Sequence, residues 1–378
     1  MTDNPGVLWT IASFLLVIGP LIFVHELGHY FVGRWFGVKA EVFSIGFGRE
    51  IAGWTDRRGT RWKLAWLPLG GYVKFAGDMN AVGQPSPEWL ALPAEERART
   101  FQAKSVWKRF LIVLAGPVTN FLAAIIILTG FNLAYGVPRT PPVIGGFTKE
   151  SPAPAAGLRA GDRIVSIDGK GVGRFEDILP VIALKVGGDP INIEVERQGR
   201  RFAVDVRPVV VTSKDRFGNV DRRPMLGVGA VDQVLAPVSP PGAVSAAVSQ
   251  CWVVVATTVK GLGQIITGSR SVKEMGGPLK IAKFSGEQAS MGPLAFLWFI
   301  AVISINLGFI NLLPIPMLDG GHLLFYGIEA ARRKPLRPEA QEWAFRTGLA
   351  ALLTLMILVT FNDLGSFGLW SKLGGLID

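Results

Sequence analysis

Cysteine is almost absent from this sequence: the one cysteine among 378 residues, Cys251, excludes any disulfide within the chain. A domain outside the cytoplasm would therefore have to fold without covalent cross-links. Acidic residues are also few, 29 against 39 basic ones, so the net charge is +10. The basic residues lie mainly beside apolar stretches, which is typical of cytoplasmic loops of membrane proteins. Nucleic acid, the other partner that such a charge could indicate, is not expected.

Histidine is scarce as well, with three in the whole chain. Two of them, His25 and His29, flank Glu26 at the end of the apolar run that begins at Val7. Residues four apart on a helix share a face, so both imidazoles can reach one Zn²⁺ while Glu26 acts on a water molecule there. Each ionisable side chain at membrane depth costs about 2.5–3.5 kcal/mol on insertion scales. This cost favours a metal site over a pair of hydrogen-bonded core histidines.

Four apolar stretches approach the roughly 20 residues that a membrane-spanning helix needs. They are residues 7–36, 110–135, 293–313 and 345–361, and an interfacial tail with Trp370 follows the last. The first could be mistaken for a signal peptide, but Asp3 stands where such a peptide is basic and no small-residue cleavage site follows. We expect it to be retained. Lys and Arg cluster after the first and third stretches, which predicts that both of those ends face the cytoplasm.

Residues 41–78 are too polar for a further span. Their short apolar runs, interrupted by glycine and rich in aromatic residues, are typical of β-hairpins, with Asp56–Gly59 as the turn. Lipid-exposed strand edges are excluded from the hydrocarbon, so the hairpins should lie at the interface or line a cavity beside the histidines. The hairpins could be a cytoplasmic β-subdomain without a role in binding, or they could provide a strand edge that contacts the substrate. The connector at 79–104 is predicted to contain a short helix near 93–99.

A soluble module is predicted at residues 138–208. The expected elements are a strand at 143–147, a short helix at 151–156, a helix at 175–186 and a hairpin formed by 191–196 and 201–206. The string from Gly157 to Gly169 resembles the signature of PDZ domains, in the permuted form found in bacterial proteases. Such domains accept a peptide C-terminus as an added strand. A spacer or size filter that binds no peptide is the alternative.

The segment after this module is irregular and rich in proline up to about residue 238. Residues 242–268 are apolar but interrupted by Lys260 and by glycines, which indicates an amphipathic helix on the membrane surface. The sequence thus predicts a polytopic α-helical membrane protein with about four transmembrane helices, a membrane-associated β-hairpin region and one extracytoplasmic PDZ domain. The predicted boundaries are 1–36, 37–104, 105–136 (second transmembrane helix), 137–209 (PDZ), 210–292 (linker and surface helices), 293–322 (third transmembrane helix), 323–344 (cytoplasmic loop) and 345–378.

One zinc ligand is still missing, because a catalytic zinc site uses three protein ligands and an exchangeable position. Asp319 is the best candidate: it follows the proline-broken end of the third span, at the depth expected for His25 and His29. An N-cap of the helix that begins at Gly320 is its other possible role. His322 could bind the metal instead, or support a ligand.

Three asparagines within the predicted spans need partners, because an unpaired amide is costly in a membrane. Asn120, Asn306 and Asn311 should therefore face the interior of the helical bundle. We predict that they lie near the site and bind substrate. Each could equally tie neighbouring helices together.

Several motifs in this order resemble one family. They are His25–His29, Phe43–Gly48, Leu67–Lys74, Ala115–Asn120 and Asn306–His322. They are similar to those of the site-2 proteases, which are intramembrane zinc metalloproteases, and closely to the bacterial RseP type, over nearly the whole length. The resemblance implies that His25, His29 and Asp319 hold Zn²⁺, that Glu26 is the base, and that Asn306 and Asn311 clamp the substrate. The RseP type carries tandem PDZ domains, whereas one is expected here.

The predicted function is that of a metalloendopeptidase that cleaves single-pass membrane proteins in or near their transmembrane segments. The resemblance places it in a bacterial inner membrane, with the active site toward the cytoplasm and the PDZ domain in the periplasm. It implies anti-sigma factors or signal-peptide remnants as substrates, and no residue chooses between them. The lipid bilayer and peptide C-termini at the PDZ domain are the other expected partners. A zinc transporter or sensor, or a non-catalytic PDZ scaffold, is the alternative, although neither needs Glu26.

Overall fold

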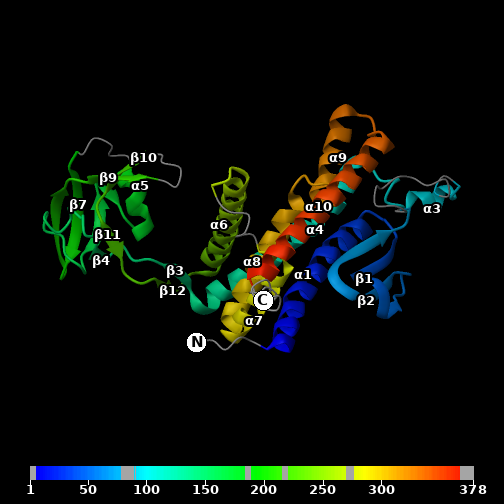
Figure 1. The fold of residues 1–378 in the computed structure, drawn as a ribbon, viewed down its shortest axis with the longest axis horizontal. Helices are drawn as coiled ribbons and strands as arrows, with labels where there is room; N and C mark the ends of the chain where they lie inside the picture. Colours follow the sequence, from blue (N-terminus) through cyan, green and yellow to red (C-terminus); the bar gives the residue numbers. More distant parts are fainter. Residues whose placement is uncertain are drawn as a thin grey trace, which may run out of the picture. The chain divides into compact units, whose positions relative to one another are not determined.

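The computed structural model describes residues 6–77, 89, 91–183, 189–214, 220–269 and 276–366. The chain divides into two compact units, Met1–Thr129 with Ala247–Asp378, and Gly130–Ala246. The first unit consists of helices and one β-hairpin, and the second is mainly β-structure (Figure 1). The predicted tail with Trp370 and most of the connector between residues 78 and 90 lie outside the described residues.

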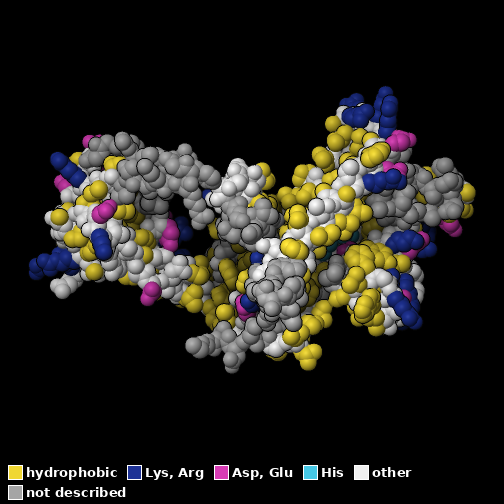
Figure 2. All heavy atoms as spheres, in the orientation of Figure 1, with side chains coloured by type: hydrophobic (Ala, Val, Ile, Leu, Met, Phe, Trp, Pro, Cys, Tyr) yellow, Lys and Arg dark blue, Asp and Glu magenta, His cyan; other side chains and the backbone are white. Residues whose placement is uncertain are grey.

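Five helices in the described part of the chain are long and apolar enough to cross a membrane. They are α1 (Val7–Trp35), α4 (Val106–Tyr135), α6 (Pro240–Ile266), α8 (Pro293–Leu312) and, within α10 (Pro338–Ser366), the segment Glu339–Gly365. Large apolar side chains on their outer faces are exposed, among them Leu8 (85%), Ile126 (70%) and Ile357 (68%). Figure 2 shows such side chains spread over the helices. A surface of this kind suits lipid rather than water.

Helix α6 differs from its predicted role as a surface helix. Its residues Ala247 and Cys251 are buried in one core with Leu128 of α4 and Ile305 of α8. The hydroxyl of Thr258 donates a hydrogen bond to the side-chain oxygen of Asn306 in α8, at 2.8 Å. The helix is therefore packed into the helical unit, and among the described residues five helices, rather than the predicted four, meet the length and composition requirement for crossing. Small residues on one face allow this packing, which the charge pattern of the sequence did not indicate.

Helices α1 and α4 approach closely at Gly28. A Cβ atom there would lie 2.4 Å from the carbonyl oxygen of Ala115 and 2.6 Å from Oγ1 of Thr119. The Thr119 hydroxyl donates a hydrogen bond to the carbonyl of Val24, at 3.0 Å, which joins the two helices. Helix α4 continues through Pro117 without a break. The histidine-bearing turn of α1 thus lies directly beside α4.

Strands β1 (Ala40–Thr55) and β2 (Arg61–Phe75) form the predicted hairpin. In the turn, the carboxylate of Asp56 accepts hydrogen bonds from the backbone N–H groups of Arg58 and Thr60, at 2.8 and 2.9 Å. This geometry is an Asx-type turn, in which the side chain replaces a backbone partner. The predicted short helix in the connector is α3 (Ala94–Ala98).

Both hairpin strands bend in the middle, β1 at Gly46 and Gly48, each with φ of 88°, and β2 at Gly70, with φ of 147°. Because of these bends, residues 42–45 of β1 have neighbours on both sides: residues 71–74 on one and 61–64 on the other. Within the described residues, the end of β2 from Gly71 to Phe75 has a strand partner on one side only. It therefore presents a free edge.

The second unit is built around a four-stranded sheet. Its strands, in the order β6-β5-β7-β8, are β6 (Lys170–Gly171), β5 (Arg163–Ile167), β7 (Ile191–Arg197) and β8 (Arg200–Val206). A 3₁₀ turn, η1 (Phe175–Asp177), leads into α5 (Ile178–Ala183), and the core contains Ile164, Ile167, Ile191 and Ile193. The predicted strand at 143–147 and the predicted hairpin are present. Residues 151–156 form turns rather than the predicted helix, since Pro152 and Pro154 lack N–H groups and Gly157 adopts a φ of 99°.

This unit extends beyond the boundary that the sequence predicted at residue 209. The additional strands are β9 (Val209–Lys214) paired with β10 (Val220–Met225), β11 (Val228–Ala230) paired with β4 (Ile144–Phe147), and β12 (Val234–Ala236) paired with β3 (Val137–Arg139). Leu226 is buried in the core of the unit. The prediction of an irregular segment here was wrong because these strands are short and two of the pairs join residues far apart in sequence.

Asp162 stabilises the second unit through a buried ion pair. Its carboxylate, 1% exposed, accepts hydrogen bonds from Nε and Nη2 of Arg197 at 2.6 and 2.7 Å, and from the N–H of Arg159 at 2.7 Å. Burial by itself would raise the pKa of Asp162, but the bonds from Arg197 and Arg159 outweigh it and hold the pKa below its usual value. A carboxylate of this kind adds stability above its unfolded pKa and loses that contribution as the pH falls through its folded pKa.

We therefore expect Asp162→Asn to destabilise this unit by about 2–3 kcal/mol at neutral pH, because Arg197 loses its charged partner. Amide hydrogen exchange of β5 and β7 in the full-length protein measures the effect. The difference from wild type should shrink below about pH 4. Asp189→Asn, at an exposed position, is the matched control. An equal loss of protection in both variants would contradict the assignment.

Candidate metal centre

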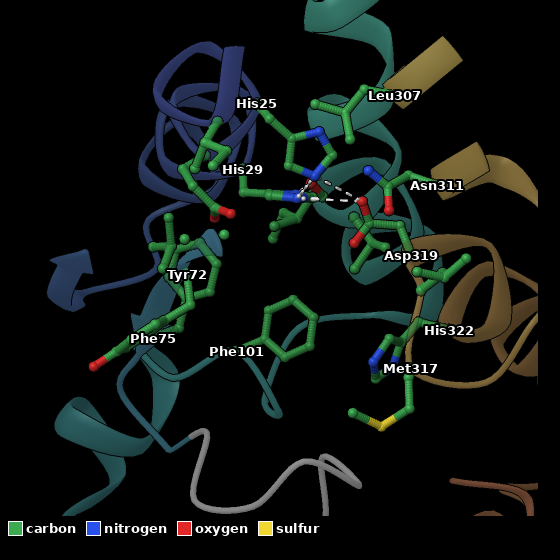
Figure 3. Close-up of a pocket in the computed structure, with 18 of the residues that line it drawn as sticks. His25, His29, Tyr72, Phe75, Phe101, Leu307, Asn311, Met317, Asp319 and His322 are labelled. Atoms are coloured by element: carbon green, nitrogen blue, oxygen red, sulfur yellow. Dashed lines mark hydrogen bonds and ion pairs between the residues drawn. The ribbon is translucent and has the colours of Figure 1, made fainter. Parts of the chain in front are cut away.

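Three side chains from two distant parts of the chain converge on one point (Figure 3). Nε2 of His25 lies 3.0 Å, and Nε2 of His29 3.5 Å, from Oδ2 of Asp319, and the two nitrogens are 3.3 Å apart. Ligand atoms bound to one tetrahedral Zn²⁺ at about 2.0–2.2 Å lie roughly 3.3–3.6 Å from one another. The His25–His29 and His29–Asp319 separations fall in this range, and the His25–Asp319 separation is slightly shorter, so the three atoms are close enough to share one zinc ion.

The outer nitrogens of both imidazoles are held by α4. Nδ1 of His29 donates a hydrogen bond to the carbonyl of Ile112, at 2.9 Å, and this leaves its Nε2 free for a metal. Nδ1 of His25 lies 3.1 Å from the amide nitrogen of Asn120. Oδ1 of this fully buried amide has no hydrogen-bond partner in the described part of the chain.

This unpaired oxygen fits a metal on His25. A metal on Nε2 requires a proton on Nδ1, and that proton needs an acceptor. A half-turn of the Asn120 amide brings Oδ1 to Nδ1 and supplies it. The residues present therefore suit a bound cation better than two neutral, metal-free imidazoles.

Asn120→Ala is expected to weaken zinc binding about 10- to 100-fold, since His25 would lose the partner that orients it. Competition with a chelator, on protein purified in detergent, measures this change. Asn120→Asp, which keeps an acceptor oxygen, should retain most of the affinity. The matched control is Asn306→Ala, because Asn306 bonds Thr258 rather than a ligand. Equal affinities for Asn120→Ala and wild type would rule out the proposed orienting role.

Gly116 of α4 forms the cradle under the two histidines. A Cβ atom at this position would lie 2.3 Å from Nε2 of His29 and 2.9 Å from Nε2 of His25. No side chain other than hydrogen fits there without displacing the ligands. Gly116 was not among the residues predicted to form the site. Its position four residues before Asn120 was an available signal, because such residues share a helix face.

Asp319 reaches the histidines because the chain breaks after α8. Residues 313–318 are not helical, Met317 has a φ of 83°, and α9 (Asp319–Arg332) then begins. A Cβ at Gly320 would lie 2.1 Å from the carbonyl oxygen of Leu313, so α9 begins in tight contact with the preceding segment. The N-cap position belongs to Leu318. Asp319 is therefore not the cap that the alternative interpretation suggested, and its carboxylate faces the imidazoles.

Glu26 lines a cavity of about 560 Å³ together with His25, His29 and Asp319. Its side chain is buried and accepts a hydrogen bond from the main chain of Val73 in β2. A Cβ at Gly71 would lie 2.9 Å from Cγ of Glu26, so the strand lies directly against this residue. Glu26 thus projects from α1 toward β2, beside His25 and His29, where it can exchange protons with a peptide bound in the cavity.

The predicted asparagines separate into two groups. Asn311 lines the cavity, as a substrate-binding residue should. Asn306 does not, because its side chain bonds Thr258 of α6 and the carbonyl of Val302. Asn120 is fully buried behind His25 and also does not line the cavity. Of the three asparagines predicted to bind substrate, the structure thus places Asn311 at the cavity, whereas Asn120 contacts His25 and Asn306 joins two helices.

This arrangement defines the class of protein: two histidines and a carboxylate that could hold a metal ion, with a glutamate beside them and apolar helices around them, are typical of a zinc peptidase. The chain matches Peptidase family M50 over residues 13–355, and it belongs to this family. It is a multi-pass membrane protein and an intramembrane zinc metalloprotease. The predicted resemblance to the site-2 proteases is confirmed, and the family favours this function over a zinc transporter or a scaffold.

Two relatives that match nearly the whole chain support the same conclusion. A protein of Agrobacterium fabrum, provisionally named a zinc metalloprotease, is 42% identical over 362 residues, which cover 94% of this chain and 96% of the relative. Metalloprotease MmpA of Caulobacter vibrioides is 36% identical over 98% of this chain and 99% of its own length. Among solved structures, the PDZ domain of an SdrC-like protein from Listeria monocytogenes is 24% identical, with a TM-score of 0.20, and covers 25% of this chain and 92% of that domain.

Proposed function

We propose that His25, His29 and Asp319 hold the zinc ion and that Glu26 is the general base for cleavage of a peptide bond in a transmembrane segment. The convergence of the three ligand atoms in a cavity lined by Glu26 carries this proposal. When bound, the zinc ion supplies Lewis acidity, which polarises a peptide carbonyl and lowers the pKa of water.

The residues of the chain supply the remaining steps. Glu26 takes a proton from the attacking water and transfers it to the nitrogen of the leaving amine. Its hydrogen bond with Val73 fixes its position relative to the strand edge. Ile112 and Asn120 hold the two imidazole rings from behind.

The substrate would bind as an extended strand. A transmembrane helix hides its carbonyls in its own hydrogen bonds, so it must unwind before an attack. The edge of β2 from Gly71 to Phe75 lies at the cavity and has no strand partner within the described residues; apart from the Val73 group that bonds Glu26, it can supply main-chain hydrogen bonds to an unwound segment. The substrates are therefore single-pass membrane proteins whose spans contain helix-weakening residues such as Gly, Asn or Pro.

Charge placement supports an active site on the cytoplasmic side of a bacterial inner membrane. Arg34 and Lys39 lie at and just after the end of α1, and Arg332, Arg333 and Lys334 lie at and just after the end of α9, so both site-bearing elements lead into basic segments. Figure 2 shows Lys and Arg side chains gathered at the end of α9. The second unit would then be the periplasmic PDZ domain, which binds peptide C-termini or restricts the size of substrates.

The test compares Asp319→Ala with wild type in detergent. The variant is expected to lose nearly all bound zinc and all cleavage, because two histidines alone do not complete the site. Zinc content is measured by atomic emission, and cleavage with a single-span test protein that carries a central Asn-Gly pair. Asp189→Ala is the control. Retention of zinc and activity by Asp319→Ala would refute the ligand assignment.

A further inference from the structure

We propose that His322 is a substrate-binding residue that hydrogen-bonds the peptide backbone on the wall of the cavity opposite β2. This inference rests on the function proposed above. An extended substrate that pairs with β2 through one edge has a second edge that faces away from β2. His322 would bind this second edge.

His322 lies in the same cavity as the metal ligands. It follows Asp319 by three residues in α9, and residues at this spacing share a helix face. In Figure 3, His322, Met317 and Asp319 form one side of the cavity, and Tyr72 and Phe75 of β2 form the other. A substrate strand that pairs with β2 would therefore pass in front of His322.

The imidazole of His322 is held in place but has free polar atoms. Its ring centroid lies 4.9 Å from that of Phe345 and 6.4 Å from that of Tyr326, so aromatic packing sets its orientation. Within the described residues, neither ring nitrogen forms a hydrogen bond. A neutral imidazole offers one donor and one acceptor, and both are available to a guest.

A bound strand needs such a partner. Its N–H and C=O groups alternate along both edges, and β2 can pair with one edge alone. Peptide groups on the other edge, removed from water in the cavity, are costly unless they find partners. Asn311 and His322 offer side-chain donors and acceptors on that side of the cavity. The two residues together can therefore satisfy positions that recur along the outer edge of the substrate, about 6.5–7 Å apart.

The first experiment measures binding without cleavage. The Glu26→Gln protein, in detergent, is titrated with the fluorescently labelled single-span test protein, with and without His322→Phe. Phenylalanine keeps the packing on Phe345 and removes both nitrogens. We expect His322→Phe to weaken binding about tenfold, and His322→Gln, which retains a donor and an acceptor, to restore most of it. Zinc content should be the same in all of these proteins.

A second experiment distinguishes a direct contact from a structural role. Test proteins with single backbone esters, which lack one N–H and have a weaker carbonyl acceptor, are scanned across the Asn-Gly region. At one position of the test protein, the ester and His322→Phe combined should weaken binding no more than the more harmful of the two changes does alone. A merely structural role predicts additive losses at every position.

Unchanged binding by His322→Phe, loss of zinc from it, or additivity throughout the ester scan overturns the proposal for His322. Failure of the proposed function is seen separately, as equal cleavage by wild type and the Glu26→Gln variant, because the binding measurements do not depend on cleavage.

Discussion

Glu26→Gln is expected to lower kcat for the single-span test protein about 10²- to 10⁴-fold while the chain keeps its full zinc content. Glutamine has nearly the same size and can still accept the hydrogen bond from Val73. It cannot take up a proton at neutral pH, so the transfer from water to the leaving amine is lost. Cleavage and zinc content are measured on the same detergent-purified sample.

Two comparisons make this result decisive. Glu339→Gln, which removes an exposed carboxylate at the start of α10, should cleave at the wild-type rate. If Glu26→Gln cleaves as fast as wild type, Glu26 is not the base. If the variant loses zinc together with activity, Glu26 acts in metal binding instead, and the division of roles among the four site residues is wrong.

Gly116→Ala is expected to weaken zinc binding by about 10- to 100-fold and to reduce cleavage accordingly. The added methyl group would lie 2.3 Å from Nε2 of His29, well inside van der Waals contact. Helices α1 and α4 already touch at Gly28, so the backbone has little freedom to separate. The imidazoles must therefore leave their positions. Chelator competition measures the affinity, and circular dichroism reports whether the helices persist.

The same helix provides a matched control. At Gly130 of α4, a Cβ atom would meet nothing within 4 Å, so Gly130→Ala should bind zinc as wild type does. Alanine there should also favour the helix by about 1 kcal/mol. Wild-type affinity in Gly116→Ala would show that the ligands do not rest on α4, contrary to the structure.

Local features of the sequence determined much of this protein. The four-residue spacing of His25 and His29, the lengths of the apolar stretches, and the turn at Asp56 each depend on neighbouring residues and were readable directly. The candidate ligand Asp319 could also be predicted from the sequence, because few positions at the expected membrane depth carry a polar residue. The structure brings it to the two histidines.

Tertiary structure alone decided which polar residues meet. Asn120 pairs with His25 and Asn306 with Thr258, although both asparagines satisfy the same requirement for a buried partner. The packing of α6, and the pairing of β11 with β4, also join residues far apart in the chain. The hydrophobic periodicity and the composition of a segment indicate which side of a helix or strand is apolar, but not which other element packs against that side. That choice depends on shape and close approach, as at Gly116, and these exist only once the helices are packed.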